Sequence, residues 1–143
     1  MSKVKSSDPF AKVRAATLAH RAKHGCGAWP YDNGPLLGVM AAAVEAKRIL
    51  ELGTALGYTS LSFANGASKA KVDTIERDPE HVRLARANIA AAGMDRRINV
   101  HEGDFAKVLP TLDAAMTSRS STAIPRCLRC TRRCASCCGS AAC

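Results

Sequence analysis

Short apolar runs and longer amphipathic stretches alternate along residues 9–113. Each apolar run has about the length of a buried strand, whereas each amphipathic stretch repeats its apolar residues at helical spacing and has proline or glycine near its ends. The predicted strands are 49–52, 71–75 and a third that begins near 98, and the predicted helices are about 9–24, 35–46, 57–64 and 79–92. This alternation predicts an α/β fold with a Rossmann-like, doubly wound parallel sheet that binds its ligand at the carboxyl ends of the strands.

The stretch that joins the first predicted strand to a helix reads ILELGTALGYTS, from Ile49 to Ser60. Glu51 stands near the carboxyl end of the strand, and Gly53 and Gly57 lack the side chains that would keep a ligand away from the backbone. The following helix directs its amino terminus at the same place, which favours an anionic group there. A glycine turn can also be a simple connector, and Glu51 can serve only to cap the amides of the turn.

A second acidic residue strengthens the prediction of a nucleotide site. Glu76 follows the second predicted strand, nineteen positions after Gly57, which is the spacing at which an α/β unit brings a carboxylate to the hydroxyls of a ribose. The pyrophosphate fingerprint GxGxxG is incomplete, because Ala55 occupies the place of its middle glycine. The pattern therefore favours a ligand without a diphosphate, and an NAD or nucleotide-sugar enzyme with a degenerate fingerprint is the alternative within this class.

Four segments together carry a resemblance to a known family. They are GPLLG at 34–38, ELGTxxGYTS in the turn, IERDPEH at 75–81 and INVHEGDFAKVLPTL at 98–112. With these segments in order, the chain resembles the class I methyltransferases that use S-adenosylmethionine, and more narrowly the catechol and caffeoyl-CoA type of small-molecule O-methyltransferase. The resemblance covers about residues 34–113, and the combination is far more specific than any one segment.

The resemblance implies a set of cofactor-binding residues. In that family the glycine turn carries the methionine part of S-adenosylmethionine, the acid after the second strand holds the ribose, and the Gly-Asp pair after the third strand lies beside the adenine. The residues that would take these roles here are Glu51, Gly53, Thr54, Gly57, Tyr58, Thr59, Glu76, Gly103 and Asp104. Two of these residues have a structural alternative, since Asp104 can merely cap a helix and Tyr58 can merely pack on the turn.

The resemblance further implies a small-molecule acceptor and a divalent cation, Mg²⁺, whose ligands would follow the matched region and are missing from it. It also implies a division into an arm (residues 1–33), a cofactor-binding core (34–113) and a tail (114–143). The arm would help to shape the acceptor pocket and a homodimer contact, with Trp29 and Tyr31 as pocket candidates or as loop anchors. No residue can be assigned a catalytic role, and the four histidines have no partner at metal-binding spacing in the sequence.

Composition changes abruptly after Asp113. Six of the seven cysteines lie between Cys127 and Cys143, and residues 114–143 hold five arginines but no lysine, aspartate or glutamate. The net charge of +9 therefore falls to +4 for residues 1–113. Such a tail could be a zinc site in a non-catalytic interaction protein, but three residues between the CxxC pairs are too few for the usual zinc folds. Nucleic-acid binding is disfavoured, because arginine suits phosphate but the tail has no aromatic residue for stacking.

The interpretation that we favour is that the tail is translated out of frame and is disordered. Codons for Ala115-Met116-Thr117 force an aspartate in a neighbouring frame, and the following codons permit Tyr-Asp-Val-Ala-Phe-Ile-Asp-Gly-Asp, which resembles the fourth strand of the O-methyltransferase family. The chain would then hold only the cofactor half, would be inactive by itself, and would expose the first strand as an apolar edge of a marginally folded domain. The chain starts with polar residues and contains no apolar run of about 18 residues, so we expect a cytoplasmic protein without a membrane span.

Overall fold

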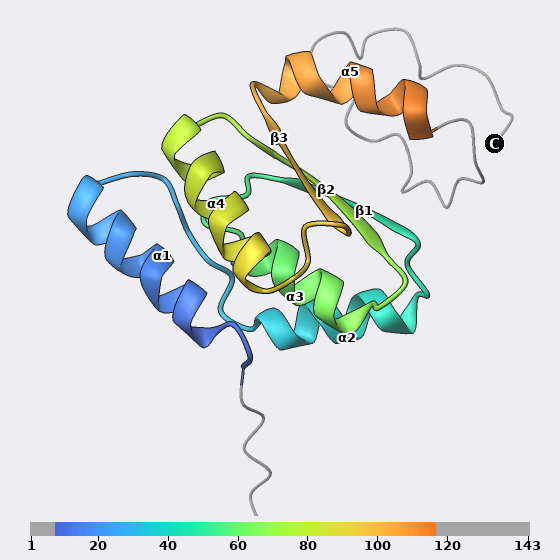
Figure 1. Ribbon diagram of the computed structural model, residues 1–143, viewed down its shortest axis with the longest axis horizontal. Coiled ribbons are helices and arrows are strands. Elements are labelled where there is room, and N and C mark those ends of the chain that lie inside the picture. Colours follow the sequence, from blue (N-terminus) through green and yellow to red (C-terminus); the bar gives the residue numbers. More distant parts are fainter. Residues whose placement is uncertain (1–7, 117–143) are drawn as a thin grey trace, which may run out of the picture.

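A computed structural model describes residues 8–116, with side chains as far as Leu112. Three parallel strands form one sheet in the order β1-β2-β3, and helices alternate with the strands along the chain (Figure 1). The elements are α1 (Ala11–His24), α2 (Gly34–Ala43), β1 (Arg48–Leu52), α3 (Tyr58–Gly66), β2 (Lys71–Glu76), α4 (Pro79–Ala91), β3 (Ile98–Glu102) and α5 (Phe105–Met116). The predicted α/β architecture with three parallel strands is confirmed.

Polar caps and prolines fix where two of the helices begin. Asn33 accepts the N–H of Leu36 at 3.2 Å ahead of α2, and Asp78 accepts the N–H of Glu80 at 2.9 Å ahead of α4. Both helices carry proline in their first turn, where the missing N–H costs no hydrogen bond. Because these signals are local, the start of each helix lies within one residue of its predicted position.

The strands are paired so that their carboxyl ends meet at one edge of the sheet. Leu52 is paired with Ile75, and Glu76 with Glu102. Two further bonds extend this ladder past the strands, from the N–H of Gly53 to the carbonyl of Ile75 and from the N–H of Gly103 to the carbonyl of Glu76, both at 2.9 Å. The loops that follow the three strands therefore begin side by side.

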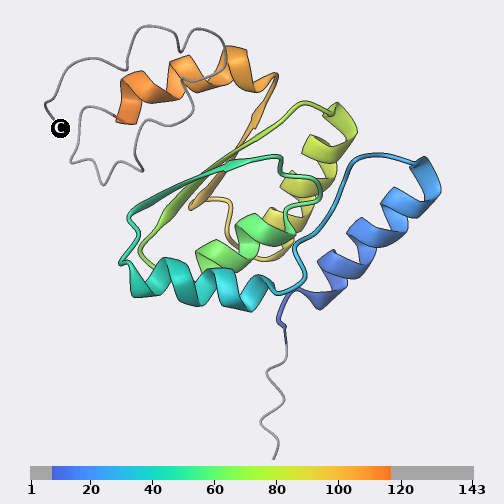
Figure 2. The ribbon, with the colours of Figure 1, turned by 180° about the vertical axis from the view of Figure 1, so that it is seen from behind.

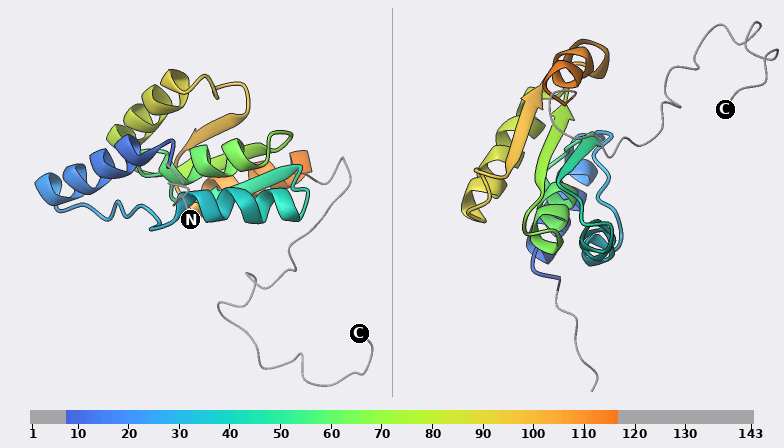
Figure 3. Two further views of the ribbon diagram at one scale, coloured as in Figure 1. Left: turned by 90° about the horizontal axis from the view of Figure 1, so that it is seen from below. Right: turned by 90° about the vertical axis from the view of Figure 1, so that its right-hand side faces the viewer.

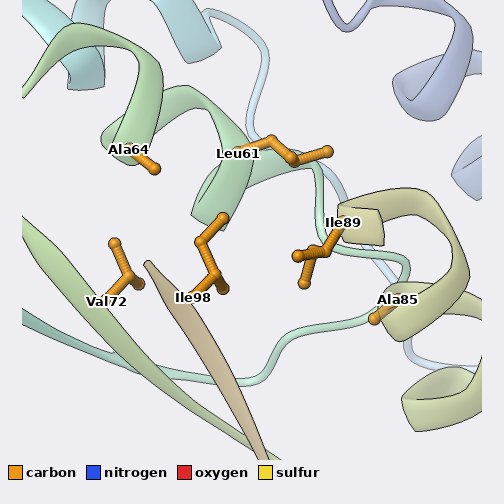
Figure 4. Close-up of a cluster of buried hydrophobic side chains, with 6 residues drawn as sticks. All are labelled: Leu61, Ala64, Val72, Ala85, Ile89 and Ile98. Atoms are coloured by element: carbon orange, nitrogen blue, oxygen red, sulfur yellow. The ribbon is translucent and has the colours of Figure 1, made fainter. Parts of the chain in front are cut away.

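The main core lies between the sheet and two helices on one of its faces. Leu61 and Ala64 of α3 and Ala85 and Ile89 of α4 pack toward Val72 of β2 and Ile98 of β3 (Figure 4). All six side chains are buried. Burial at this cluster fixes α3 and α4 against the strands, and it thereby positions the amino termini of both helices near the carboxyl ends of the strands.

A second contact brings the backbones of α2 and α3 together at Gly38 and Gly66. The two helices run side by side (Figure 2), and a Cβ atom placed on Gly66 would stand 2.2 Å from the carbonyl carbon of Gly38. Ala41, Ala67 and Ala70 form a small buried cluster beside this contact. The GPLLG segment thus contributes a close helix contact that only glycine permits.

The N-terminal arm packs through α1. Phe10 and Val13 contact the main core, and α1 lies beside α4 in Figure 1 and in the left view of Figure 3. The helix ends at Gly25, whose φ of 62° is left-handed and whose N–H binds the carbonyl of Arg21. The turn at Gly25 sends the chain back along α1 toward α2.

Strand β1 is the outer strand of the described sheet on the side away from β3. Its residues Leu50 and Leu52 are 37% and 43% exposed, although both are apolar. The predicted exposure of the first strand as an apolar edge is confirmed for the described residues. Within residues 8–116, no helix combines the length and the apolar character that crossing a membrane requires.

Several element ends differ by one to three residues from their predicted positions. Helix α2 stops at Ala43 instead of Ala46, because Glu45 takes a φ of 49° and the N–H of Ala46 turns back to the carbonyl of Ala41. Helix α5 spans Phe105–Met116 and so includes the first three residues of the predicted tail. The rest of the predicted tail, with its cysteines, lies outside the described residues.

Candidate functional site at the carboxyl ends of the strands

The turn between β1 and α3 is a tight loop with three left-handed residues. Gly53 and Gly57 both have a φ of 90°, and Ala55 between them has a φ of 46°. A Cβ atom on Gly53 would meet no atom within 4 Å, so its backbone is open to the surroundings, whereas Gly57 packs on Ala85 and Ile89 of α4. The turn is therefore anchored at its helix end and accessible at its strand end, as a turn that receives a ligand must be.

Glu51 supports the turn from inside the fold. Its carboxylate accepts the hydroxyl protons of Ser60 on α3 and of Thr74 on β2, the latter at 2.8 Å. Thr74 also shares a hydrogen bond of 2.6 Å with buried Thr54 of the turn. Desolvation by burial raises the pKa of Glu51 to about 7, although these two hydroxyls act in the opposite direction. Glu51 is thus hydrogen-bonded to hydroxyl groups of α3 and β2. The sequence alternative was that Glu51 caps the amides of the turn.

Glu76 projects from the end of β2 toward the same turn. One carboxylate oxygen accepts the N–H of Ala55 at 2.9 Å, and the other accepts the N–H groups of Arg77 at 2.8 Å and Asp78 at 3.0 Å. The half-buried carboxylate is therefore held by three backbone donors at the point where β2 passes beside the glycine turn. This is the place that the sequence spacing predicted for a ribose-binding acid.

Gly103 and Asp104 follow β3 at the same edge. Gly103 has a φ of 145°, and the exposed carboxylate of Asp104 accepts the N–H of Ala106 at 2.8 Å in the first turn of α5. Asp104 therefore caps a helix in this structure, which was its structural alternative. Its location beside Glu76 in the sheet leaves it within the candidate site as well.

Tyr58 and Thr59 form the first turn of α3. The hydroxyl of Tyr58 donates to Asp8 at 2.6 Å and accepts the N–H of Gly34 at 3.0 Å, so its buried side chain joins α3 to the arm and to α2. These bonds fit the alternative in which Tyr58 is a packing residue, and its cofactor-binding role stays a prediction. Thr59 is half-buried in the first turn, where helix N–H groups have no partner within the helix.

The two pocket candidates of the arm lie on the surface. Trp29 is 61% exposed with the guanidinium of Arg21 stacked 4.2 Å from the centre of its ring, and Tyr31 is 46% exposed. The stacking holds the loop against α1, which agrees with the interpretation of these aromatics as loop anchors. A surface hollow of about 380 Å³ lies against α4 and β3, and another of about 250 Å³ lies against α2. Neither hollow includes the glycine turn. The candidate site is an open edge of the sheet.

Several residues escaped the sequence analysis because their roles depend on the fold. Ser60 and Thr74 meet Glu51 only through the pairing of β1 with β2, and the donor of Ala55 is a backbone group. The sequence spacing of the histidines also gave no sign of a contact between the arm and α4. The side chains of His20, Cys26 and His81 lie together, with possible ligand atoms within 4.8 Å of one another.

Comparisons with known proteins agree with this fold. Catechol O-methyltransferase of Mycobacterium tuberculosis is 39% identical over 82 residues, which cover 57% of this chain and 37% of that protein. Catechol O-methyltransferase of Niastella koreensis is 35% identical over an alignment of the same length and coverage. The crystal structure of the O-methyltransferase TomG from Streptomyces achromogenes in complex with SAM matches with a TM-score of 0.65 and 29% identity, covering 78% of this chain and 49% of TomG.

This chain spans about half the length of the solved structures that it matches, and little more than a third of these two catechol O-methyltransferases. A family model described as O-methyltransferase matches residues 2–121, which is most of the 143 residues. With the turn, the acid after β2 and the Gly-Asp pair after β3 in the places described above, the chain belongs to the O-methyltransferase family.

Proposed function

We propose that this chain binds S-adenosylmethionine and represents the cofactor-binding half of a small-molecule O-methyltransferase. The observation that carries the proposal is the open glycine turn at Gly53 beside the carboxylate of Glu76, at one edge of the sheet. Solved O-methyltransferases of the same fold contain this cofactor or its product, as in the complex of TomG with SAM and the Bacillus cereus enzyme in complex with SAH. The acceptor is a small hydroxyl compound of the catechol class, by analogy with the named relatives.

Each proposed contact follows from the chemistry of the ligand. The cofactor offers a ribose, an adenine and a methionine portion but no diphosphate, which suits a turn with Ala55 at its centre. Glu76 accepts hydrogen bonds from the ribose hydroxyls. Its present hydrogen bond from the N–H of Ala55 is then either broken or retained by one carboxylate oxygen. The N–H groups of the turn and of the first turn of α3 bind the methionine carboxylate. Gly103 and Asp104 lie where the adenine would reach the edge of β3.

The bound cofactor would supply an electrophilic methyl group on a sulfonium, and the chain's own residues would hold it in place. Charge at the sulfur disappears during transfer, so the protein contributes mainly orientation and the exclusion of water. The described residues do not fit the expected Mg²⁺ site, since Glu51 and Glu76 are bound by hydroxyls and backbone N–H groups, and the three-residue ligand group among residues 8–112 contains no carboxylate. We therefore propose cofactor binding without methyl transfer by this chain alone.

Calorimetric titration of the full chain with S-adenosylhomocysteine tests the proposal. We expect one site, and we expect Glu76→Gln to weaken binding by about 10- to 100-fold, because a charge-assisted hydrogen bond contributes roughly 1.5 to 3 kcal/mol. Glu102→Gln is the matched control, because Glu102 is an exposed carboxylate at the same register position of the next strand. Equal affinities of the two variants would contradict the assigned role of Glu76.

A competition titration and an activity assay separate this proposal from its alternatives. If NAD displaces S-adenosylhomocysteine at comparable concentration, the site belongs to a dinucleotide enzyme. Turnover of catechol with S-adenosylmethionine by the homogeneous chain would contradict the proposed lack of methyl transfer. The homodimer contact ahead of β1 and a cytoplasmic location also remain proposals, and ultracentrifugation and cell fractionation test them.

A further inference from the structure

The contact between α1 and α4 gathers side chains that are far apart in sequence. His20 lies on α1, Cys26 follows the left-handed turn at Gly25, and His81 lies in the first turn of α4. Their possible ligand atoms all lie within 4.8 Å of one another. The rings of His20 and His81 meet edge to face with centroids 5.1 Å apart (the helices are side by side in Figure 1).

His81 gives the second observation, which is independent of this clustering. Its side chain is 8% exposed, and its Nε2 atom is buried without a hydrogen-bond partner among the described residues. A buried polar nitrogen without a partner destabilises the folded state unless a ligand binds it. The other ring nitrogen, Nδ1, lies 3.9 Å from a carboxylate oxygen of Glu76. A carboxylate on one side of an imidazole and a metal ion on the other is the common arrangement around ligating histidines.

We propose that His20, Cys26 and His81 form a binding site for one zinc ion. Two imidazoles and one thiolate are ligands that Zn²⁺ prefers, whereas Mg²⁺ and Ca²⁺ prefer oxygen. Tetrahedral coordination places such ligand atoms about 3.5 Å apart, so the 4.8 Å cluster needs to contract by about 1 Å. His20 and Cys26 are half-buried, which gives the ion a path from the surface. Water takes the fourth position.

The proposed ion would join the arm to the core where other contacts are few. Within α1, Thr17 is the buried residue. Arg14 of α1 forms an ion pair with Asp32, whose side chain is exposed. A metal bond from α1 and its following loop to α4 would therefore hold the arm in place. The two sites share one neighbour, because Glu76, the proposed ribose-binding acid, also lies 3.9 Å from Nδ1 of His81. The metal test uses other ligands and needs no S-adenosylmethionine.

The test uses the full chain with the six tail cysteines changed to serine, because those thiols would bind metal themselves. In this background we expect one Co²⁺ ion to give the sulfur-to-metal absorption band of a cobalt thiolate, and Zn²⁺ to displace it. Cys26→Ser should abolish the band, and His81→Gln should weaken zinc affinity by more than the 10- to 100-fold that loss of an outer-shell partner costs. His101→Gln is the control, since its imidazole lies on β3 and binds Asp73 at 3.0 Å.

Hydrogen exchange supplies a readout that a variant with altered folding cannot mimic. In the background chain, zinc should slow the hydrogen exchange of the α1 amides. In the Cys26→Ser chain, zinc should leave the exchange of these amides unchanged. The α4 and sheet amides should be protected equally in the two chains. A background chain that shows no cobalt–sulfur band overturns the proposal. So does zinc affinity that is the same in the Cys26→Ser, His81→Gln and His101→Gln chains.

Discussion

The raised pKa of Glu51 links the glycine turn to pH. Burial holds the pKa of this carboxyl at about 7, against an ordinary value of 4.5 in the unfolded chain. Between these two values the folded state binds more protons, so the free energy of unfolding decreases as pH rises from about 4.5 to about 7 and is level above that. We expect a contribution on the order of 1 to 3 kcal/mol, fully present below pH 4.5.

Urea midpoints measured from about pH 5 to about pH 8 check this expectation. Glu51→Gln should remove most of the decrease, because the amide has no proton to lose, and exposed Glu102→Gln should retain it. A Glu51→Gln chain with the same pH dependence as the unchanged protein would show that another group is responsible.

At the scale of single residues, the sequence predicted positions better than contacts. Glu76 lies at the end of β2, as its spacing from Gly57 predicted. The nineteen positions after Gly57, up to Glu76, hold one helix, one loop and one strand. Tyr58 shows the opposite case, since its neighbours Asp8 and Gly34 come from other elements and no local pattern announces them. The cluster at His20, Cys26 and His81 was missed for the same reason.

Among the elements, the contact between α2 and α3 depends on glycine. A Cβ atom on Gly66 would stand 2.2 to 2.3 Å from three backbone atoms of Gly38, which no side-chain rotation can relieve. We expect Gly66→Ala to lower the free energy of unfolding by at least about 1 to 3 kcal/mol, the usual cost of overpacking. Circular dichroism during urea unfolding measures it.

Gly27→Ala is the matched control for this contact. A Cβ atom there meets nothing within 4 Å, and the exposed position should tolerate alanine or gain slightly through a less flexible unfolded chain. If both variants unfold at the same urea concentration, the helices separate more easily than this packing implies.

Element types and starts could be predicted because caps, prolines and periodicity are local. Pro79 marked the start of α4, and Gly53 and Gly57 marked the turn before α3. The end of α2 could not be predicted in the same way, because no glycine or proline marks the left-handed turn at Glu45 that leads to β1. Local sequence patterns do not predict a helix end that depends on tertiary contacts.

For the whole molecule, the exposed strand β1 predicts low stability and self-association. Its apolar side chains Leu50 and Leu52 stand on an open sheet edge, and α2 exposes Val39, Met40 and Val44 nearby in the chain. Such an edge can pair with a second chain through backbone hydrogen bonds. We expect the weight-average mass in sedimentation to increase with concentration, and the urea slope to be smaller than that of full-length relatives.

Leu50→Lys should reduce this association, because a charge on the edge strand opposes pairing with another strand. Val44→Lys removes a side chain that is 74% exposed at the end of α2 and leaves the strand edge unchanged, so it is the appropriate control. Equal loss of association in both variants would assign the contact to apolar surface in general and not to the strand edge.

The open edge of β1 also makes the chain an acceptor for fragment complementation. A separately expressed segment that follows the matched region in a full-length relative could add its strand beside Leu50 and cover the exposed face. The cofactor turn and the incoming fragment would then lie on different polypeptides, joined by strand addition. Methyl transfer recovered on mixing would report the encounter of the two pieces, and the chain would become one half of a split enzyme.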